Sequence, residues 1–282
     1  MTTTSPVTPA SGLAVPAAAS RAGFGHLLLA EWTKIRSVRS TVWTMIGFVV
    51  LTVGLTAGLS ALVVGSWTGP RAGPRDAGVV ADPIGFILGA GIGLGQLTIC
   101  VLGVLVITTE YSTGVIRASL LAVPRRIPML AAKAVVFAAL LTVLAEIVAF
   151  GSFFTGSALL HSKVDVSLGA PGVTRSVIGA GLYLTVLGLL ALAIGALIRH
   201  TAGAISTVIG VVLVLPILSG LLPGSWGMHV NAYLPEQAGS LIFQTHRQAS
   251  QLLSPWQGFG VLCLWTAALL TAAAYLLRRR DA

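Results

Sequence analysis

Six long apolar stretches constrain this chain more than any other feature of its sequence. Each has about 20 or more mostly apolar residues, the length that a helix needs to cross the hydrocarbon core of a bilayer. The alternating polar and apolar pattern of a membrane β-barrel is absent. The sequence therefore predicts an all-α polytopic membrane protein with six transmembrane helices, whose approximate ranges are 42–64, 84–108, 129–154, 177–198, 202–222 and 256–277.

The composition excludes an ordinary water-soluble domain. Only 9% of the residues are charged and 55% are hydrophobic, with a mean hydropathy of +0.93, whereas soluble domains carry about 25% charged residues. The net charge of +9 does not indicate nucleic-acid binding, because the basic residues gather at the ends of the apolar stretches. We therefore expect membrane lipid around the chain and no nucleic acid.

The distribution of Lys and Arg predicts the orientation. An even number of spans places both termini on one side, and that side holds most of the basic residues, including Arg278, Arg279 and Arg280. Cytoplasmic loops carry such an excess, so we expect a multi-pass protein of the cell (plasma) membrane with both termini cytoplasmic. Residues 1–20, rich in Thr, Pro and Ala, are expected to form a disordered cytoplasmic tail before one six-helix transmembrane domain at 21–282.

An amphipathic segment precedes the first span. Its apolar residues recur at helical spacing between Phe24 and Arg39, and Glu31, Lys34 and Arg36 fall mostly off that stripe. This pattern predicts a helix on the inner leaflet with its Lys and Arg near lipid headgroups, separated from the first span by a polar break at 37–40. The alternative is that the segment simply extends the first span.

The outer side has one long segment, from Pro223 to Pro255. Its apolar stretch at 232–243, with Pro235 near the start, predicts a short re-entrant or interfacial helix, although an ordinary loop fits equally well. Pro216 predicts a kink in the fifth helix. Regularly spaced glycines indicate close helix packing, inside the bundle or in a dimer, at Gly85, Gly89 and Gly93 and at Gly181, Gly188 and Gly195.

Few residues of the chain could carry chemistry. It has no phosphate-binding GxxxxGK[ST] motif, no HExxH and no Cys/His cluster, so we expect no enzyme activity, no metal and no cofactor bound by this chain. Glu146 is the clear ionisable residue inside a span, where a charge costs about 2.5–3.5 kcal/mol. It could line a translocation path, together with Gln96, or hydrogen-bond to Gln96 or Thr185 and hold helices together.

A polar island, Glu110 to Arg117, follows the second apolar stretch. Ser112 or Thr113 could cap a short helix beginning near Gly114. Taken alone, the island fits either a docking element or a plain basic loop.

Together, these segments resemble the permease subunit of type-2 ABC transporters. The resemblance covers about residues 22–280 and rests on the order and spacing of 31–37, 110–117 and Pro235-Glu236-Gln237-Ala238-Gly239 around six spans. It implies an elbow helix containing Glu31, Trp32, Lys34 and Arg36. It implies a coupling helix for an ATP-binding subunit, involving Glu110, Tyr111, Gly114 and Arg117. It implies an outer segment that closes the exit path, containing Pro235, Glu236 and Gly239.

The same resemblance implies an exporter subunit with a separate ABC ATP-binding partner, and ATP and Mg²⁺ are expected in that partner. A second permease copy or homologue completes a dimer. The alternative is an ATP-independent secondary transporter or a membrane anchor protein, although secondary transporters commonly show internal repeats and several ionisable groups at mid-membrane.

Overall fold

The computed structural model describes residues 23–37, 39–69, 71, 73–113, 126–222, 225–245 and 251–279. Throughout these ranges the regular elements are helices, without a strand. Six of the helical segments are long and apolar enough to cross a membrane, which confirms the predicted all-α polytopic fold. They are α2 (Arg39–Gly65), α4 (Pro83–Ser112), α6 (Arg126–Leu160), α7 (Val173–Ile198), the α8–η1–α9 run (Thr201–Gly220) and α12 (Pro255–Arg279).

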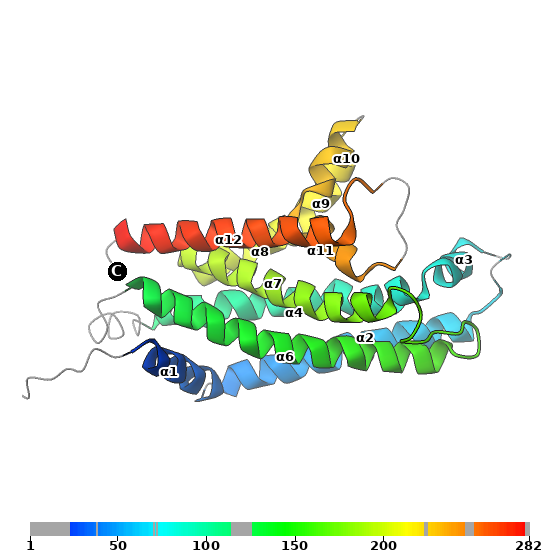
Figure 1. Ribbon diagram of the computed structural model, residues 1–282, viewed down its shortest axis with the longest axis horizontal. Coiled ribbons are helices and arrows are strands. Elements are labelled where there is room, and N and C mark those ends of the chain that lie inside the picture. The colour runs from blue at the N-terminus through cyan, green and yellow to red at the C-terminus, as the bar shows by residue number, and fades with distance from the viewer. Residues whose placement is uncertain are drawn as a thin grey trace, which may run out of the picture.

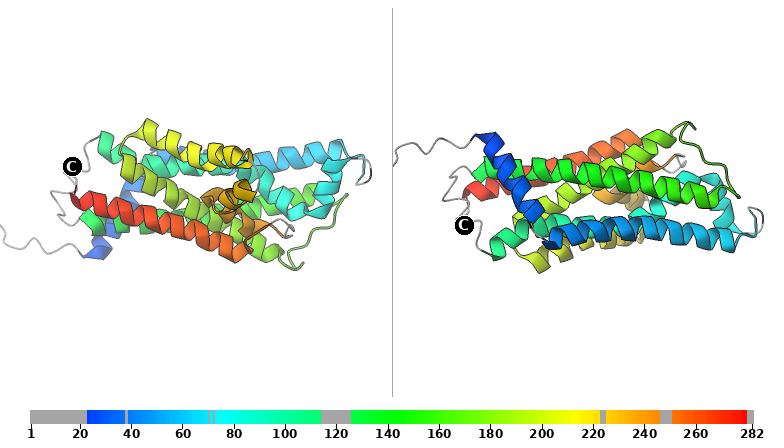
Figure 2. Two further views of the ribbon diagram at one scale, coloured as in Figure 1. Left: turned by 90° about the horizontal axis from the view of Figure 1, so that it is seen from above. Right: turned by 90° about the horizontal axis from the view of Figure 1, so that it is seen from below.

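The long helices run side by side and define two ends of the bundle (Figure 1). One end, named here the α1 end, carries α1 (Phe24–Ser37) and the last turns of α12. The opposite end, named the α3 end, carries α3 (Pro74–Ala81). α1 stops at Ser37 and α2 starts at Arg39, in agreement with the predicted break, and α1 crosses obliquely over the start of α6 (Figure 2).

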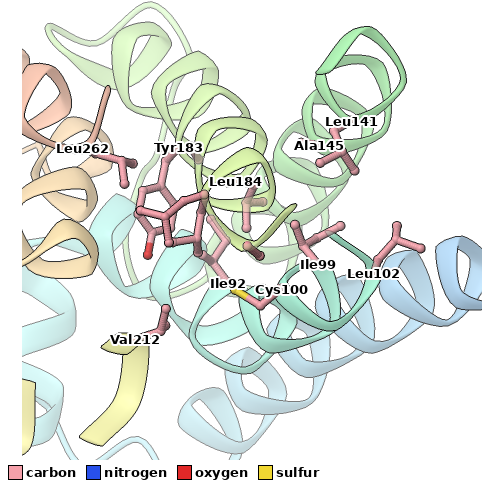
Figure 3. Packing of buried hydrophobic residues seen from close by; sticks show 14 of the residues in the cluster. Ile92, Ile99, Cys100, Leu102, Leu141, Ala145, Tyr183, Leu184, Val212 and Leu262 are labelled. Carbon is pink, nitrogen blue, oxygen red and sulfur yellow. The ribbon is translucent and has the colours of Figure 1, made fainter. Parts of the chain in front are cut away.

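Helix α7 forms the centre of the bundle. It is the most deeply buried of the six spans and packs against α4, α6, α8 and α12. Close approach to α4 depends on glycine, since a Cβ added at Gly103 would lie 2.4 Å from the carbonyl oxygen of Gly188. The α7 glycines predicted to mediate packing therefore do so inside the bundle. Figure 3 shows Tyr183 of α7 in the core close to Ile92 and Leu262.

The fifth span is irregular before Pro216, where the sequence predicts a kink. Helix α8 (Thr201–Ile209) passes through a π-helical turn, η1 (Gly210–Val214), into α9 (Leu215–Gly220). Proline has no N–H to donate to the preceding turn, and such irregular turns relieve its clash with the helix. The turn between α7 and α8 is as short as expected, with Arg199 in the left-handed region at φ 60°.

The segment after α9 contains three short helices. They are α10 (Ser225–Ala232), α11 (Pro235–Ser240) and the 3-10 turn η2 (Leu241–Phe243). The sequence predicted a short helix with Pro235 near its start but did not predict α10. α11 packs closely on the core, because a Cβ added at Gly239 would lie 2.6 Å from Leu262 and 2.9 Å from the Tyr183 ring. In Figure 1, α9 and α10 rise away from the bundle while α11 lies against α12.

Candidate functional site

Four charged side chains from three helices meet at the α1 end and form what we name the ion-pair cluster: Glu31, Lys34, Glu110 and Lys133. The Lys133 ammonium, only 2% exposed, donates to Glu31 Oε2 at 2.5 Å and to Glu110 Oε1 at 2.8 Å. The Lys34 ammonium donates to Glu31 Oε1 at 2.8 Å and to Glu110 Oε1 at 3.1 Å. The cluster thus links α1, the last turn of α4 and the start of α6.

The two positive and two negative charges of the cluster balance each other. Burial raises the pKa of Glu31, but the charge and hydrogen bonds of Lys133 and Lys34 outweigh it and hold that pKa below its ordinary value. Burial lowers the pKa of Lys34, but Glu31 and Glu110 outweigh it and raise that pKa above its ordinary value. Buried charges are tolerated only when each has its partners. Loss of any one member therefore leaves an unpaired charge at the junction of three helices.

The structure places Glu31 on the buried face of α1 with Ile35, although the sequence predicted it to lie mostly off the apolar stripe. Lys34 is partly exposed and bonds to two carboxylates. Trp32 and Arg36 are exposed. Lys133 was not among the predicted site residues. The signal that could have identified it is its position inside the apolar stretch at 129–154, where a charge requires a partner of opposite sign.

The polar island begins inside α4 rather than after it. Glu110 and Tyr111 belong to the last turn of that helix, which continues to Ser112. The hydroxyls of Ser112 and Thr113 donate back to the Thr109 carbonyl at 3.1 and 2.7 Å. The residues that they were predicted to cap lie outside the described part of the chain.

Tyr111 connects this end of α4 to the turn after α7. The Arg199 guanidinium lies over the Tyr111 ring, 5.2 Å from its centroid, a cation–π arrangement. Gly114 and Arg117, and the coupling helix predicted around them, lie outside the described residues. The expected disordered tail at 1–20 also lies outside them.

Glu146 and Gln96 are not hydrogen-bonded to each other. Gln96 Oε1 accepts from the Tyr183 hydroxyl at 2.5 Å, and the Thr185 hydroxyl donates to Gly181 O at 2.9 Å. The expected Glu146 bond to either residue is thus not formed. Glu146 instead packs on Gly181, where a Cβ would lie 2.4 Å from its Oε1, and its buried Oε2 has no hydrogen-bond partner within the described part of the chain.

A second polar region is a cavity of about 600 Å³ near the α3 end, which we name the α3-end cavity. Its walls come from α3, α4, α11 and η2, and its polar lining includes Asp82, Gln96 and Glu236. Pro235 starts α11 and Gly239 packs it on the core, so both position Glu236 at the cavity.

The glycines of α4 lie on two different faces of the helix. Gly89 and Gly93 line the cavity, and a Cβ added at either would meet no atom within 4 Å. Gly91 and Gly95 instead pack against α2, and a Cβ added at Gly91 would lie 2.3 Å from the Thr56 hydroxyl oxygen. Gly89 and Gly93 were expected to bring helices together and instead leave open space.

The described residues contain no group of three or more His, Cys, Asp or Glu side chains that could hold a metal ion. Both cysteines, Cys100 and Cys263, are free thiols. In comparison with known proteins, no family model and no curated protein matches this chain.

Proposed function

We propose that this chain is the transmembrane subunit of an ATP-driven exporter that couples to a separate ATP-binding protein. The α1 end is cytoplasmic in this proposal, because it holds Arg278 and Arg279 of α12 and the basic residues of α1. α1 serves as the elbow helix, and residues 110–117 form the contact with the ATP-binding partner. A second copy or homologue of the chain completes the transport unit in the cell membrane.

The ion-pair cluster is the observation that carries this proposal. Residues 114–125 connect α4 to α6, and the cluster lies between the end of α4 and the start of α6 through Glu110 and Lys133. It also holds α1 through Glu31. A displacement of the connecting residues by a partner therefore acts on three helices together, as rigid-body coupling requires.

Purification of the tagged protein from its native cell in a mild detergent tests the proposal. We expect an ATP-binding protein to co-purify and to hydrolyse ATP. Arg117→Ala should reduce its recovery, and Glu110→Ala should leave the complex assembled but uncouple ATP hydrolysis from the transmembrane helices. Lys163→Ala is the matched control, since Lys163 is exposed between α6 and α7 and should have no effect. Absence of any ATP-binding partner in several mild detergents would overturn the proposal.

A secondary transporter is the second candidate, and Glu146 favours it. A carboxyl oxygen without a hydrogen-bond partner inside a span is typical of proton-linked transport paths. In that case purified protein in liposomes would move protons or substrate without ATP, and Glu146→Gln would abolish the movement. An ATP-driven exporter would show no such activity without its partner.

A further inference from the structure

We propose that the α3-end cavity binds amphipathic organic cations, meaning an ammonium, phosphonium or guanidinium group on an apolar body. Binding itself requires no partner protein. The further step, that such cations are the exported cargo, rests on the proposed function.

The cavity has room for a small organic molecule. Its volume of about 600 Å³ lies within the usual range of ligand pockets, about 300–1,000 Å³. The open space is built into α4, because Gly89 and Gly93 present no side chain to it and a Cβ at either would touch nothing within 4 Å. Larger residues at these two positions would fill the cavity without moving the backbone.

The charges of the cavity favour a cation. Glu236 lines it from α11, and its buried Oε2 has no hydrogen-bond partner within the described ranges. A carboxyl in such a place is either protonated or paired with a positive group. Asp82 adds a second carboxylate, although its Oδ1 already accepts from the Gly85 N–H and the Thr245 hydroxyl.

Arg75 is a basic residue of the described lining, and its guanidinium is bonded outside the cavity lining. It donates to the Ser66 hydroxyl at 3.1 Å. Hydrogen bonds from Thr68 and Gly69, together with the charge of Arg75, hold the pKa of Asp76 below its ordinary value. The charge of Arg75 is offset by Asp76, so the described lining keeps two carboxyl groups, those of Glu236 and Asp82, with which a bound cation can pair.

The remaining wall is apolar and partly aromatic. Phe86 and Ile92 of α4 and Phe243 of η2 line the space. The Phe243 ring is held edge-to-face on Tyr183 at 5.4 Å between centroids. Aromatic faces attract cationic groups, and an apolar wall favours burial of an apolar body. A ligand that carries both therefore fits this lining.

Binding of tetraphenylphosphonium to the purified full-length protein in maltoside detergent tests the inference. Tetraphenylborate has the same shape and the opposite charge, so it measures partition that is independent of charge sign. We expect saturable binding of tetraphenylphosphonium and no saturable binding of tetraphenylborate. Equal binding of the two ions would overturn the proposal.

Variants identify the cavity as the place of binding. Glu236→Gln should weaken tetraphenylphosphonium binding about tenfold or more, whereas Asp165→Asn, at an exposed position, should not. Gly89→Leu should abolish binding by filling the cavity, whereas Gly54→Leu, at an exposed position of α2 with open space around it, should not. Unchanged binding by Glu236→Gln would refute the assignment even if Gly89→Leu failed to fold.

Two sources could supply such a cation: a soluble molecule or the headgroup of a choline lipid. Dihexanoylphosphatidylcholine added as a competitor separates them, since displacement assigns the site to the lipid headgroup and retention assigns it to soluble cations. All these measurements are made without an ATP-binding partner. Cation binding with no partner found would keep this inference and reject the proposed function.

Discussion

At the scale of single residues, Lys133 is the most deeply buried charged side chain of the described part of the chain. Within that part, its charge is paired with Glu31 and Glu110. Breaking a buried ion pair by removing one partner costs about 3–5 kcal/mol, whereas replacing the whole pair by apolar groups can be neutral. The cluster therefore acts as a unit, and its members should show strong energetic coupling.

Lys133→Met should lower the free energy of unfolding by about 3–5 kcal/mol, because it leaves Glu31 and Glu110 with one lysine between them. Glu31→Leu combined with Lys133→Met should recover most of that loss, since Lys34 still pairs with Glu110. Denaturant unfolding in detergent micelles measures both effects, and Lys163→Met at an exposed position serves as the control. Additive losses in the double variant would contradict this coupling.

The docking of α1 should depend on pH only at the extremes. The pKa of Glu31 in the docked helix is lowered from its ordinary value of 4.5, so the ionised carboxylate stabilises docking above pH 4.5. This stabilisation is lost as the pH falls below 4.5. The pKa of Lys34 in the docked helix is raised from its ordinary value of 10.5, so the charged ammonium stabilises docking below pH 10.5. This stabilisation is lost as the pH rises above 10.5. Docking should therefore be constant between these limits.

A spin-label distance between Thr33→Cys on α1 and Ala131→Cys on α6, both exposed positions, measures this docking after Cys100 and Cys263 are replaced by alanine. The distance distribution should stay narrow at neutral pH and broaden as pH falls below 4.5. The same labels with Lys133→Met should give a broad distribution already at neutral pH. A broad distribution at neutral pH in the unmodified cluster would contradict the prediction.

At the scale of elements, backbone contact between α4 and α7 sets the spacing of the bundle. The contact at Gly103 is against a backbone carbonyl, which cannot rotate away as a side-chain end could. Glycine in an exposed helix is otherwise unfavourable relative to alanine by up to about 1 kcal/mol. A glycine-to-alanine substitution should thus destabilise the protein at a buried contact and have no effect or stabilise it at an exposed helix position.

Gly103→Ala should destabilise the protein by about 1–3 kcal/mol through overpacking, because the new Cβ would lie 2.4 Å from Gly188 O. Gly54→Ala should be neutral or stabilising, since nothing lies within 4 Å of its Cβ. Thermal unfolding of the two variants in the same detergent makes the comparison. Equal destabilisation at both sites would refute backbone contact as the cause.

At the scale of the whole molecule, the two ends of the bundle have different character. The α1 end holds the ion-pair cluster and the basic ends of α1 and α12, whereas the α3 end holds the cavity and the acidic residues Asp76, Asp82 and Glu236. Loops rich in Lys and Arg stay in the cytoplasm. Charge asymmetry thus predicts which end faces the outside.

Cysteine accessibility in intact cells tests this orientation. A membrane-impermeant maleimide should label Lys163→Cys, between α6 and α7, and should not label Ser37→Cys, at the end of α1, until the cells are opened. Both positions are exposed, and Cys100 and Cys263 are replaced first. Labelling of Ser37→Cys in intact cells would reverse the assigned orientation.

The sequence by itself determined the number, type and approximate bounds of the spanning helices. A bilayer requires about 20 apolar residues for each span, and that requirement is local and visible in one dimension. The helix break before Arg39, the helix start at Pro235 and the irregularity before Pro216 were also predictable, because proline and polar breaks act on their own neighbours in the chain.

Only the tertiary structure decided which polar residues meet. Glu31 lies 102 positions from Lys133, and no helical periodicity could show that the buried face of α1 would carry a charge. Gly85, Gly89 and Gly93 likewise form a regular stripe that predicts close helix packing, yet Gly89 and Gly93 face the cavity. Pairing and open space depend on how separate helices pack, which local patterns do not encode.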